Sequence, residues 1–337
     1  MKIAIHHRPD SFSERWIDYC KENGIPYILV NAYSSDIISQ VHDCDVFMWH
    51  YHHAEFKDML FAKELLFSLE IAGKRVFPSF HTGWFFDDKI AQMYLLQAIG
   101  APLVPSYVFY SKSEAIQWVQ NATFPKVLKL RCGAGAMNVR LVSTRKEAIG
   151  FIDKLFKSGL TQINRLNDLK ERIRKYRNRE IDFFSLCKGF GRFLVPMKYV
   201  KMQKAEKGYA YFQEYIRGNE FDIRVIVIGD KAFSIKRLVR EKDFRASGSG
   251  KIIYTREELD ETCVKLSFKV NAFIRSQCIA YDFIYDENGN PLIVELSHGF
   301  SMHGYDACPG YWTSDLVWHE EKFNPQYWLI KDVINNK

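Results

Sequence analysis

The sequence predicts a mixed α/β protein that begins with a doubly wound parallel sheet and continues into β-rich structure. Strand-like and helix-like segments alternate through the first hundred residues, which is typical of a parallel sheet with helices on both faces. Residues 126–142, KVLKLRCGAGAMNVRLV, read as two strands joined by a glycine turn. From Tyr211 onward, long apolar runs such as FDIRVIVIG and KAFSIKRLV have strand character.

The N-terminal part contains four apolar runs of strand length: KIAIHH, PYILVNA, DVFMWHY and KRVFPSF. Segments with helical spacing separate them. The first, SERWIDYCKENG, offers Ser13 as a candidate N-cap and a glycine at its end, and the last spans residues 56–72. In such a sheet, ligands bind beyond the carboxyl ends of the strands.

Further helices are expected at residues 87–99, at residues 113–120 and, with a basic composition, at residues 152–179. The turn at residues 133–135 is read first as a hairpin and second as a phosphate-binding loop. A second hairpin is predicted in IAYDFIYDENGNPLIVELS, which turns at Asn288-Gly289.

The bulk composition is that of a soluble intracellular protein. At 337 residues the chain is long enough for two or three domains. Its seven cysteines are scattered and form no C-x-x-C pair, which indicates reduced thiols. The N-terminal apolar segment is too short for a signal peptide, and no run reaches the roughly 20 apolar residues of a membrane span. We therefore expect a cytoplasmic protein without a transmembrane segment.

The net charge of +7 is concentrated in residues 151–210, where fifteen Lys and Arg outnumber six Asp and Glu, giving +9 there and −2 elsewhere. Such a segment suits an anionic partner, and a solvated helix face explains it equally well. Basic and aromatic residues are not interleaved on one element, so nucleic-acid binding is not expected.

Histidines gather where the predicted strands of the first sheet end. Six of the ten histidines lie there, with Arg8 beside them: His6, His7, His50, His52, His53 and His81. Their spacing matches no familiar metal site. The favoured reading is a pocket for a polar or anionic small molecule, and the alternative is capping of the sheet edge.

Asp282 and Glu295 lie on the two strands of the last predicted hairpin, in apolar surroundings. Buried carboxylates are costly unless a cation compensates them, and a short hairpin can bring the two together over one face. Two carboxylates and nucleotide phosphates are a usual way to hold Mg²⁺. Structural carboxylates at strand ends are the alternative.

Taken in order, these motifs resemble the ATP-grasp superfamily. The succession runs from Lys89 in DDK through Lys129, the glycine turn, FQEYI, DIRVIVIG, SIKRL and DFRASGSGK to the carboxylate pair. The chain is most similar to the branch of glutathione synthetases and ribosomal-protein glutamate ligases, over nearly its whole length. This resemblance implies an N-terminal Rossmann-like domain (residues 1–104), a central lobe (105–210) and a C-terminal lobe (211–337), with ATP clasped between the two β-rich lobes.

The resemblance also implies the site residues. Those expected to bind ATP are Lys89, Lys129, Gly133, Gly135, Gln213, Glu214, Ile216, Glu220 and Asp222. The two lysines would neutralise the phosphates while the glycines close over them, which favours the phosphate reading of that turn. The adenine hinge would run from Gln213 to Ile216, and Glu220 or Asp222 would meet the ribose. Arg237 and Arg245 would face the transferred phosphoryl group, with Lys236 a weaker candidate.

The Mg²⁺ ligands implied by the resemblance are Asp282, Glu295 and Ser297. The family usually has Glu-x-Asn where this chain has Glu295-Leu296-Ser297, which leaves one or two metal ions open. Because the lysines, arginines and carboxylates are all present, we expect an active enzyme. An inactive ATP-binding regulatory protein is the alternative.

The chemistry implied is carboxylate–amine ligation. ATP phosphorylates a carboxylate, and an amine attacks the acyl-phosphate to give an amide, ADP and phosphate. No protein nucleophile is needed, and Cys132 is read as a spectator. Small-molecule carboxylates and amines are therefore the expected partners, and homodimerisation is left open.

The substrate class is expected from the C-terminal part, whose aromatic residues suit sugar rings or a core plug alike: Tyr305, Tyr311, Trp312 and Trp318. This part resembles ATP-grasp proteins of bacterial surface-polysaccharide gene clusters. We therefore expect an amide between an amino acid or small amine and a sugar acid or aminosugar. The alternative is a ligase that adds an amino acid to the C-terminal carboxylate of a peptide or protein.

Overall fold

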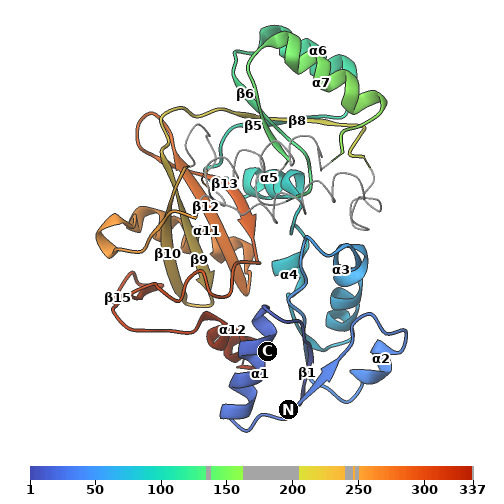
Figure 1. Ribbon diagram of the computed structural model, residues 1–337, viewed down its shortest axis with the longest axis vertical. Helices are drawn as coiled ribbons and strands as arrows, with labels where there is room; N and C mark the ends of the chain where they lie inside the picture. Colours follow the sequence, from blue (N-terminus) through green and yellow to red (C-terminus); the bar gives the residue numbers. More distant parts are fainter. Residues whose placement is uncertain (134–137, 162–204, 240–245, 247–249, 336–337) are drawn as a thin grey trace, which may run out of the picture. The chain divides into compact units, whose positions relative to one another are not determined.

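The computed structural model describes residues 1–133, 138–161, 205–239, 246 and 250–335, which form three sheets (Figure 1). Contacts divide the chain into unit 1, residues 1–52, 57–104 and 216–337, and unit 2, residues 53–56 and 105–215. Unit 1 thus contains both the N-terminal part and the C-terminal lobe. The three domains expected from the sequence stay a prediction.

The N-terminal sheet of unit 1 is parallel and doubly wound, which confirms the predicted fold class. Its strands lie in the order β2 (Tyr27–Val30), β1 (Ile3–His6), β3 (Val46–Met48) and β4 (Arg75–Phe77). Its helices are α1 (Phe12–Glu22), α2 (Ile37–Gln40), α3 (Phe56–Ile71), α4 (Phe80–Gly83) and α5 (Lys89–Ala98).

The predicted N-cap of the first helix is wrong. The helix begins at Phe12 and Ser11 occupies the N-cap position, so Ser13 lies inside the first turn. The Ser13 hydroxyl donates to the Arg8 carbonyl oxygen and accepts from the Arg8 backbone N–H, both at 3.2 Å. Ser13 therefore fixes the loop that precedes α1.

The second sheet of unit 1 is antiparallel. Its order is β13 (Pro291–Ser297), β12 (Cys278–Tyr285), β9 (Phe221–Ile228), β10 (Lys231–Leu238), β14 (Tyr311–Thr313) and β15 (Trp318–His319), with β11 (Ile252–Ile253) also paired to β10. The predicted hairpin is confirmed, because β12 and β13 pair across a turn in which Gly289 adopts φ +77°. Asp286 stabilises this turn by accepting from the backbone N–H groups of Asn288 and Asn290.

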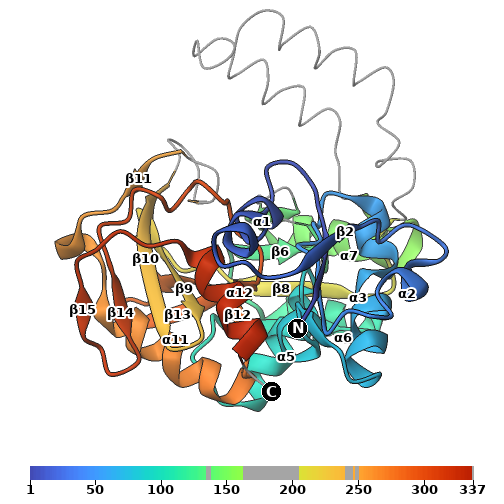
Figure 2. The same ribbon diagram turned by 90° about the horizontal axis from the view of Figure 1, so that it is seen from below.

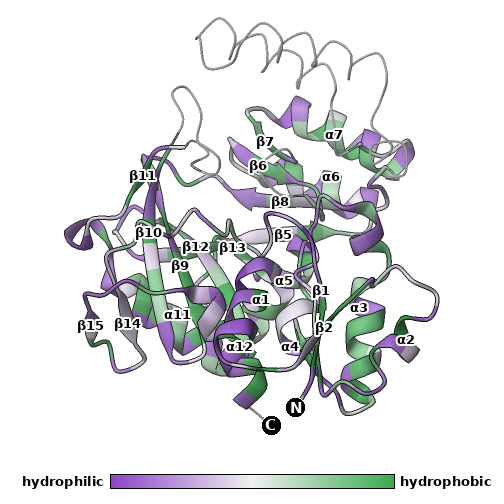
Figure 3. Ribbon diagram, turned by 60° about the horizontal axis from the view of Figure 1, so that its bottom comes forward, coloured by the Kyte–Doolittle hydropathy of each residue, from purple (hydrophilic) through white to green (hydrophobic). Residues whose placement is uncertain are grey.

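Alternation along the strands places the two sheets of unit 1 around a shared core. Ile226 and Ile228 of β9 pack with Ile3 and Ile5 of β1, together with α1 and α12 (Pro325–Asn335). Figures 1 and 2 show α12 beside α1. The odd-numbered apolar residues of β9 face the opposite side, where α11 (Glu261–Ile274) covers them. Hydrophobic residues accordingly run along β9 and β12 (Figure 3).

In the described residues of unit 2, an antiparallel sheet of four strands carries two helices packed on one face. The strand order is β5 (Ser106–Phe109), β8 (Ala210–Glu214), β6 (Lys126–Lys129) and β7 (Val139–Val142). The helices α6 (Lys112–Asn121) and α7 (Arg145–Lys157) share a core with Leu128, Leu130 and Phe212. The strand–turn–strand reading of residues 126–142 is confirmed, since β6 and β7 pair from Lys126 with Val142 to Lys129 with Val139.

The expected basic helix at residues 152–179 is confirmed at residues 152–157, but its predicted start is wrong and it does not continue through residues 158–161. The helix α7 begins earlier, at Arg145, where Thr144 caps it by accepting from the Glu147 N–H. It ends at Lys157, before Gly159 adopts φ +80°. A Cβ at Gly159 would lie 2.8 Å from the Glu206 carbonyl oxygen, so the chain needs glycine at this close approach. Residues 162–204, most of the basic segment, lie outside the described residues.

Candidate functional site

Asp282 and Glu295 lie side by side in unit 1, as the sequence predicts. They are direct partners between β12 and β13, so their side chains project to the same face of the sheet. Arg224 of β9 is the partner of Asp282 and extends this row to a third strand. Asp282 is buried, whereas the Glu295 side chain is 33% exposed.

Two arginines hold Asp282. Arg224 donates from Nε to Oδ1 at 2.5 Å and from Nη2 to Oδ2 at 2.7 Å, and Arg237 approaches Oδ2 with Nη2 at 3.0 Å. Arg237 also donates two hydrogen bonds of 2.6 Å to Asp222. The result is a largely buried network of two guanidinium groups and two carboxylates that compensate each other's charge.

Both aspartates have shifted pKa values. Burial acts to raise the pKa of Asp282, but Arg224 and Arg237 outweigh it and hold that pKa well below its usual range. Burial raises the pKa of Asp222 despite its ion pair with Arg237, and the charge of Asp282 adds to the rise. Asp282 is therefore ionised at neutral pH. A metal ion that binds it must compete with two arginines.

Lys89 reaches this row of charges from the N-terminal part of unit 1. It is the first residue of α5, which Asp88 caps by accepting from two backbone N–H groups. The buried Lys89 side chain places Nζ 3.2 Å from Oε1 of Glu295. One turn along α5, the Gln92 amide exchanges two hydrogen bonds with the backbone of Leu296. These bonds fix α5 against the end of β13.

Ser297 makes local hydrogen bonds. Its hydroxyl donates to the Gly299 carbonyl oxygen at 2.9 Å and accepts from the Gly299 N–H at 3.2 Å. Its proton is thus committed to a tight turn, although an oxygen lone pair is left. Among the described residues, no group of three or more His, Cys, Asp or Glu could hold a metal ion by itself. The donor set of Asp282 and Glu295 fits Mg²⁺ that is shared with phosphates.

The histidines at the strand ends do not act as one group. His6 is buried between Tyr33 and Trp49, its Nδ1 accepts from the Ala32 N–H, and burial lowers its pKa. These surroundings favour a structural role for His6 over the predicted contact with a substrate. His81 is exposed on α4, where its ring contacts Phe80.

His50 is the histidine that meets the end of β13. Its ring stacks on Phe12 and its Nδ1 accepts from the Phe12 N–H at 3.4 Å. Its Nε2 lies 3.6 Å from the position that a Cβ on Gly299 would take. The edge of the parallel sheet and the turn after Ser297 are therefore in contact. His7 and Arg8 follow β1 on the same edge, and the His7 ring hydrogen-bonds the Ser13 hydroxyl. The backbone N–H of His52 donates to Asp58.

In unit 2, Lys129 and Gln213 share one face of the sheet. Gln213 pairs with Val127 in the ladder, and strand alternation puts Val127 and Lys129 on the same side. The helices cover the other side, through Leu128 and Leu130. Lys129 and Gln213 are both buried, and Gln213 donates to the Ser106 hydroxyl at 2.9 Å.

Glu214 lies on the helix-covered face, away from Lys129. Its two carboxylate oxygens bind Nζ of the buried Lys126 at 2.5 and 2.6 Å. Its side chain is therefore a structural partner of Lys126, so only its backbone is left for the predicted hinge. Ile216 follows just beyond, in unit 1.

Gly133 requires glycine for two reasons. It adopts φ +107°, and a Cβ there would overlap the Asn138 amide, which donates to the Cys132 carbonyl oxygen at 2.6 Å. Gly135 and the predicted catalytic Arg245 lie outside the described residues. Glu220 is exposed, and Lys236 pairs with Glu258 at 2.6 Å.

The C-terminal aromatic residues belong mainly to the hydrophobic core. Tyr305, Tyr311 and Trp312 are buried. Arg256 covers the rings of Trp312 and the half-buried Trp318. Tyr305 is buried beside the Arg224 guanidinium: burial raises the pKa of Tyr305, and the charge of Arg224 acts against that rise. Hence this part of the chain packs around the charge network of Asp282, and the burial of three of its four aromatic residues removes the support that they gave to a sugar substrate.

Sequence reasoning missed Arg224 and Lys126. The signal for Arg224 was present, because Asp222 and Arg224 are two charges at i and i+2 in an otherwise apolar strand. Strand alternation puts such a pair on one face. Lys126 carried no comparable signal, since its partner Glu214 lies 88 residues away in the chain.

The sequence and the fold were compared with those of known proteins. Residues 197–308 match the model of the RimK-like ATP-grasp domain. A search of curated proteins gave no match. Three solved structures show the fold of the whole chain at low sequence identity.

The first structure is a RimK domain ATP-grasp protein from Sphaerobacter thermophilus, with 13% identity, a TM-score of 0.56 and 99% of each chain covered. The second is N5-carboxyaminoimidazole ribonucleotide synthetase from Thermotoga maritima, with 14% identity, a TM-score of 0.62, and 99% of this chain and 76% of that one covered. The third is D-alanine–D-alanine ligase from Bacillus anthracis complexed with ATP, with 13% identity, a TM-score of 0.53 and 91% of each chain covered.

The fold and the domain match define the class, because the N-terminal parallel sheet and the two β-rich parts are the elements of ATP-grasp proteins. The chain has the ATP-grasp fold, and residues 197–308 match the RimK-like form of the domain. The resemblance to the ATP-grasp superfamily is confirmed. Among the described residues, no helix is long and apolar enough to cross a membrane.

Proposed function

We propose that the protein is an ATP-dependent carboxylate–amine ligase that works through an acyl-phosphate and releases ADP and phosphate. The observation that carries this proposal is the row Glu295–Asp282–Arg224, with Lys89 on one end and Arg237 beside it. Carboxylates that hold a metal with nucleotide phosphates, next to guanidinium groups that stabilise phosphoryl oxygens, suit phosphoryl transfer to a carboxylate. The RimK-like match supports the same class of chemistry.

Lys89 and Lys129 are the proposed phosphate-binding cations, and each is buried at the end of an element. The backbone of residues 213–216 is the proposed adenine hinge, with Gln213 on the face of Lys129. Glu220 is the better ribose ligand, because Asp222 is already bound to Arg237. Gly133 and Gly135 are proposed to approach the phosphates.

Asp282 and Glu295 would hold Mg²⁺, and Ser297 would contribute only if its turn with Gly299 opens. Bound Mg²⁺ neutralises phosphate charge in reactions of this kind. Arg237, and with it Arg245, is proposed to stabilise the charge that develops on the transferred phosphoryl group. Arg224 keeps Asp282 ionised and oriented through its two hydrogen bonds.

For the substrates, we propose an amino acid or small amine joined to a sugar acid or aminosugar. One support is the similarity of the sequence to ATP-grasp proteins of surface-polysaccharide gene clusters. The other is the polar edge of the parallel sheet, where His50 lies beside Gly299 and His7 and Arg8 follow β1. The free thiols of the described cysteines and the need for ATP support a reaction in the cytoplasm.

A ligase for peptide or protein C-termini is the second candidate, and the RimK-like domain favours it. An acidic C-terminal peptide with glutamate should then gain mass by one glutamyl unit. An ATP-binding regulatory protein would show neither product. The intact charge network argues against this third function, because a protein without turnover has no need of Lys89, Arg224 and Arg237 around one carboxylate pair.

Nucleotide analysis tests the proposal. Protein is incubated with Mg-ATP and a panel of hexuronates, aminosugars, amino acids, amines and acidic peptides, and ADP, AMP and phosphate are quantified. The account predicts ADP and phosphate in equal amounts, dependent on one carboxylate and one amine. AMP would indicate an adenylate mechanism, and ATP binding without turnover would favour the regulatory protein.

A further inference from the structure

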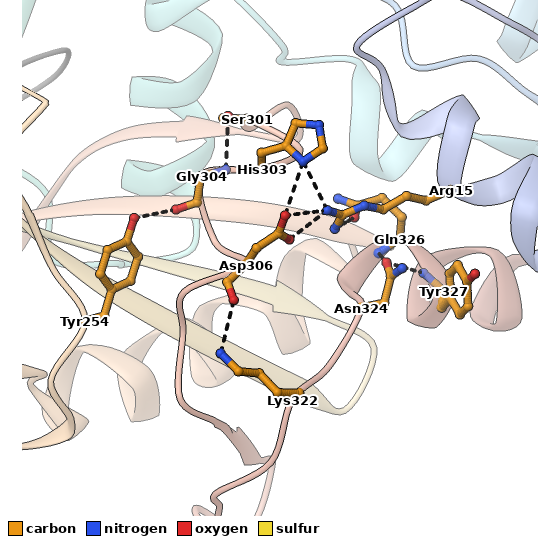
Figure 4. Close-up of polar contacts among 10 residues, drawn as sticks. All are labelled: Arg15, Tyr254, Ser301, His303, Gly304, Asp306, Lys322, Asn324, Gln326 and Tyr327. Carbon is orange, nitrogen blue, oxygen red and sulfur yellow. Dashed lines mark hydrogen bonds and ion pairs between the residues drawn. The ribbon is translucent and has the colours of Figure 1, made fainter.

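His303 and Asp306 form a hydrogen-bonded pair on residues 298–308, the segment that directly follows Ser297. Nδ1 of His303 lies 3.2 Å from Oδ2 of Asp306, and the two side chains are 67% and 44% exposed. Among the described residues, His303 makes hydrogen bonds only through Nδ1. Figure 4 shows its other ring nitrogen directed away from Asp306.

Arg15 of α1 fixes this pair. Its Nη2 donates to the two Asp306 oxygens at 2.7 and 2.6 Å, and its Nη1 donates to Oε1 of the buried Gln326 of α12 at 2.9 Å. Nη2 also lies 3.4 Å from Nδ1 of His303. Because the Nη2 hydrogens are committed to the closer carboxylate oxygens, the Nδ1–H of His303 donates to Asp306, and Nε2 keeps the lone pair.

The charged groups around His303 come from three segments. Asp306 lies on its own segment, Arg15 on α1, and Lys322 ahead of α12 donates to the Asp306 carbonyl oxygen at 3.3 Å. Partial burial acts to raise the pKa of Asp306, but hydrogen bonds from Arg15 and His303 outweigh it and lower that pKa. Asp306 therefore stays ionised and orients the imidazole.

The same segment reaches the candidate active site on its inner side. Tyr305, two residues after His303, is buried beside Arg224, the partner of Asp282. Two residues separate Cα atoms by at most about 7 Å. Tyr254 donates to the Gly304 carbonyl oxygen at 2.9 Å and holds the backbone between His303 and Tyr305. His303 thus lies on a fixed segment that begins directly after Ser297 and whose residue Tyr305 is buried beside Arg224.

We propose that His303 is the general base that deprotonates the amine substrate, oriented by Asp306 and Arg15. The proposal rests on the proposed ligase function. The amine enters as an ammonium ion and gives one proton to Nε2. Its neutral nitrogen attacks the acyl-phosphate carbon, so that a C–N bond forms and the C–O bond to phosphate breaks. Phosphate leaves with the bonding electrons and takes the second proton of the nitrogen, and the imidazolium releases its proton to water.

The test separates acyl-phosphate formation from amine attack. Hydroxylamine is a weakly basic nucleophile that traps an acyl-phosphate as a hydroxamate without needing a base. The His303→Gln variant, with Mg-ATP and the carboxylate and amine that produce ADP, should keep its hydroxamate rate. Its amide rate near neutral pH should fall by about 10²- to 10⁴-fold. The loss should shrink as pH rises, because the amine then loses its proton to water. Asp306→Asn should give a smaller loss of the same kind.

The matched control is His42→Gln. His42 is also exposed and also pairs with an aspartate, Asp43, at 2.7 Å, but it lies between α2 and β3, before the strand rather than after it. Both rates should stay unchanged. An amide rate in His303→Gln equal to wild type at every pH, or equal losses of hydroxamate and amide, would overturn the proposal. A wild type that forms no hydroxamate with any carboxylate would overturn the ligase function itself.

Discussion

Arg224 lies directly opposite Asp282 across β9 and β12, and two hydrogen bonds of 2.5 and 2.7 Å join their side chains. Asp282 is buried and Arg224 is only 16% exposed at its side chain, so each charge depends on the other. This pair links the stability of unit 1 to the site proposed for Mg²⁺.

Removal of Arg224 should therefore be costly. Arg224→Met leaves a buried carboxylate with one remaining arginine, and we expect the free energy of unfolding to fall by about 3–5 kcal/mol. Urea unfolding followed by fluorescence measures it. Lys236→Met on the neighbouring strand is the control, because Lys236 pairs with the half-exposed Glu258, and such a pair contributes under about 1 kcal/mol. Equal losses in the two variants would contradict the assignment.

Stability should depend on pH through Asp282. Its pKa is lower in the folded than in the unfolded protein, so its ionised form stabilises the fold above the unfolded-state value of about 4. That contribution is lost as the pH falls through the folded-state value. The Asp282→Asn variant should be less stable than wild type by a constant amount near neutral pH, and the difference should shrink in acid. Urea unfolding of both proteins at several pH values checks this, and a difference that grew in acid would refute it.

Mg²⁺ should bind weakly without nucleotide. Arg224 and Arg237 occupy the Asp282 oxygens. The free energy of Mg²⁺ binding is therefore favourable only when phosphate oxygens supply further ligands. Calorimetric titration of the free protein with Mg²⁺ should show no saturable binding below about millimolar concentrations, whereas the ADP complex should bind it. Glu295→Gln should weaken binding in the complex. Tight binding of Mg²⁺ to the free protein would show that the ion pairs do not restrict the site.

The two lysines of β6 should have separable roles because they lie on opposite faces. Lys129→Ala should raise the Kd for ATP at least tenfold, as expected for loss of a buried charge–phosphate contact of about 1.5–3 kcal/mol. Glu214→Gln should instead lower the free energy of unfolding, since it leaves the buried Lys126 without its carboxylate. Nucleotide titration and urea unfolding of each variant distinguish these effects. If Glu214→Gln weakened ATP binding without loss of stability, its side chain would be a nucleotide ligand.

Much of the fold and part of the site could be predicted from local sequence patterns. The hairpin of β12 and β13 follows from an Asn-Gly turn between apolar runs, and its register brings Asp282 beside Glu295. The contact of Lys89 with Glu295 depends on α5 packing against β13, 206 residues later. The family pattern, rather than any local signal, placed Lys89 at the site.

Two predicted site residues have surroundings that no local pattern indicates. His6 follows a strand, as a pocket residue would, but its ring is buried between Tyr33 and Trp49. Glu214 belongs to the predicted hinge, but its ladder position opposite Lys126 turns its side chain to the helix-covered face, so the hinge prediction concerns its backbone. In both cases the side chain's direction and long-range partner decided its role, and no single segment of sequence contains that information.

Transfer of oxygen from the carboxylate to phosphate reports directly whether the reaction passes through an acyl-phosphate. The protein is incubated with Mg-ATP, the amine, and a carboxylate labelled with ¹⁸O in both oxygens, and the released phosphate is analysed by mass spectrometry or ³¹P NMR. An acyl-phosphate route predicts ADP together with phosphate that carries one ¹⁸O atom. Label in AMP, or unlabelled phosphate in step with amide formation, would contradict the account.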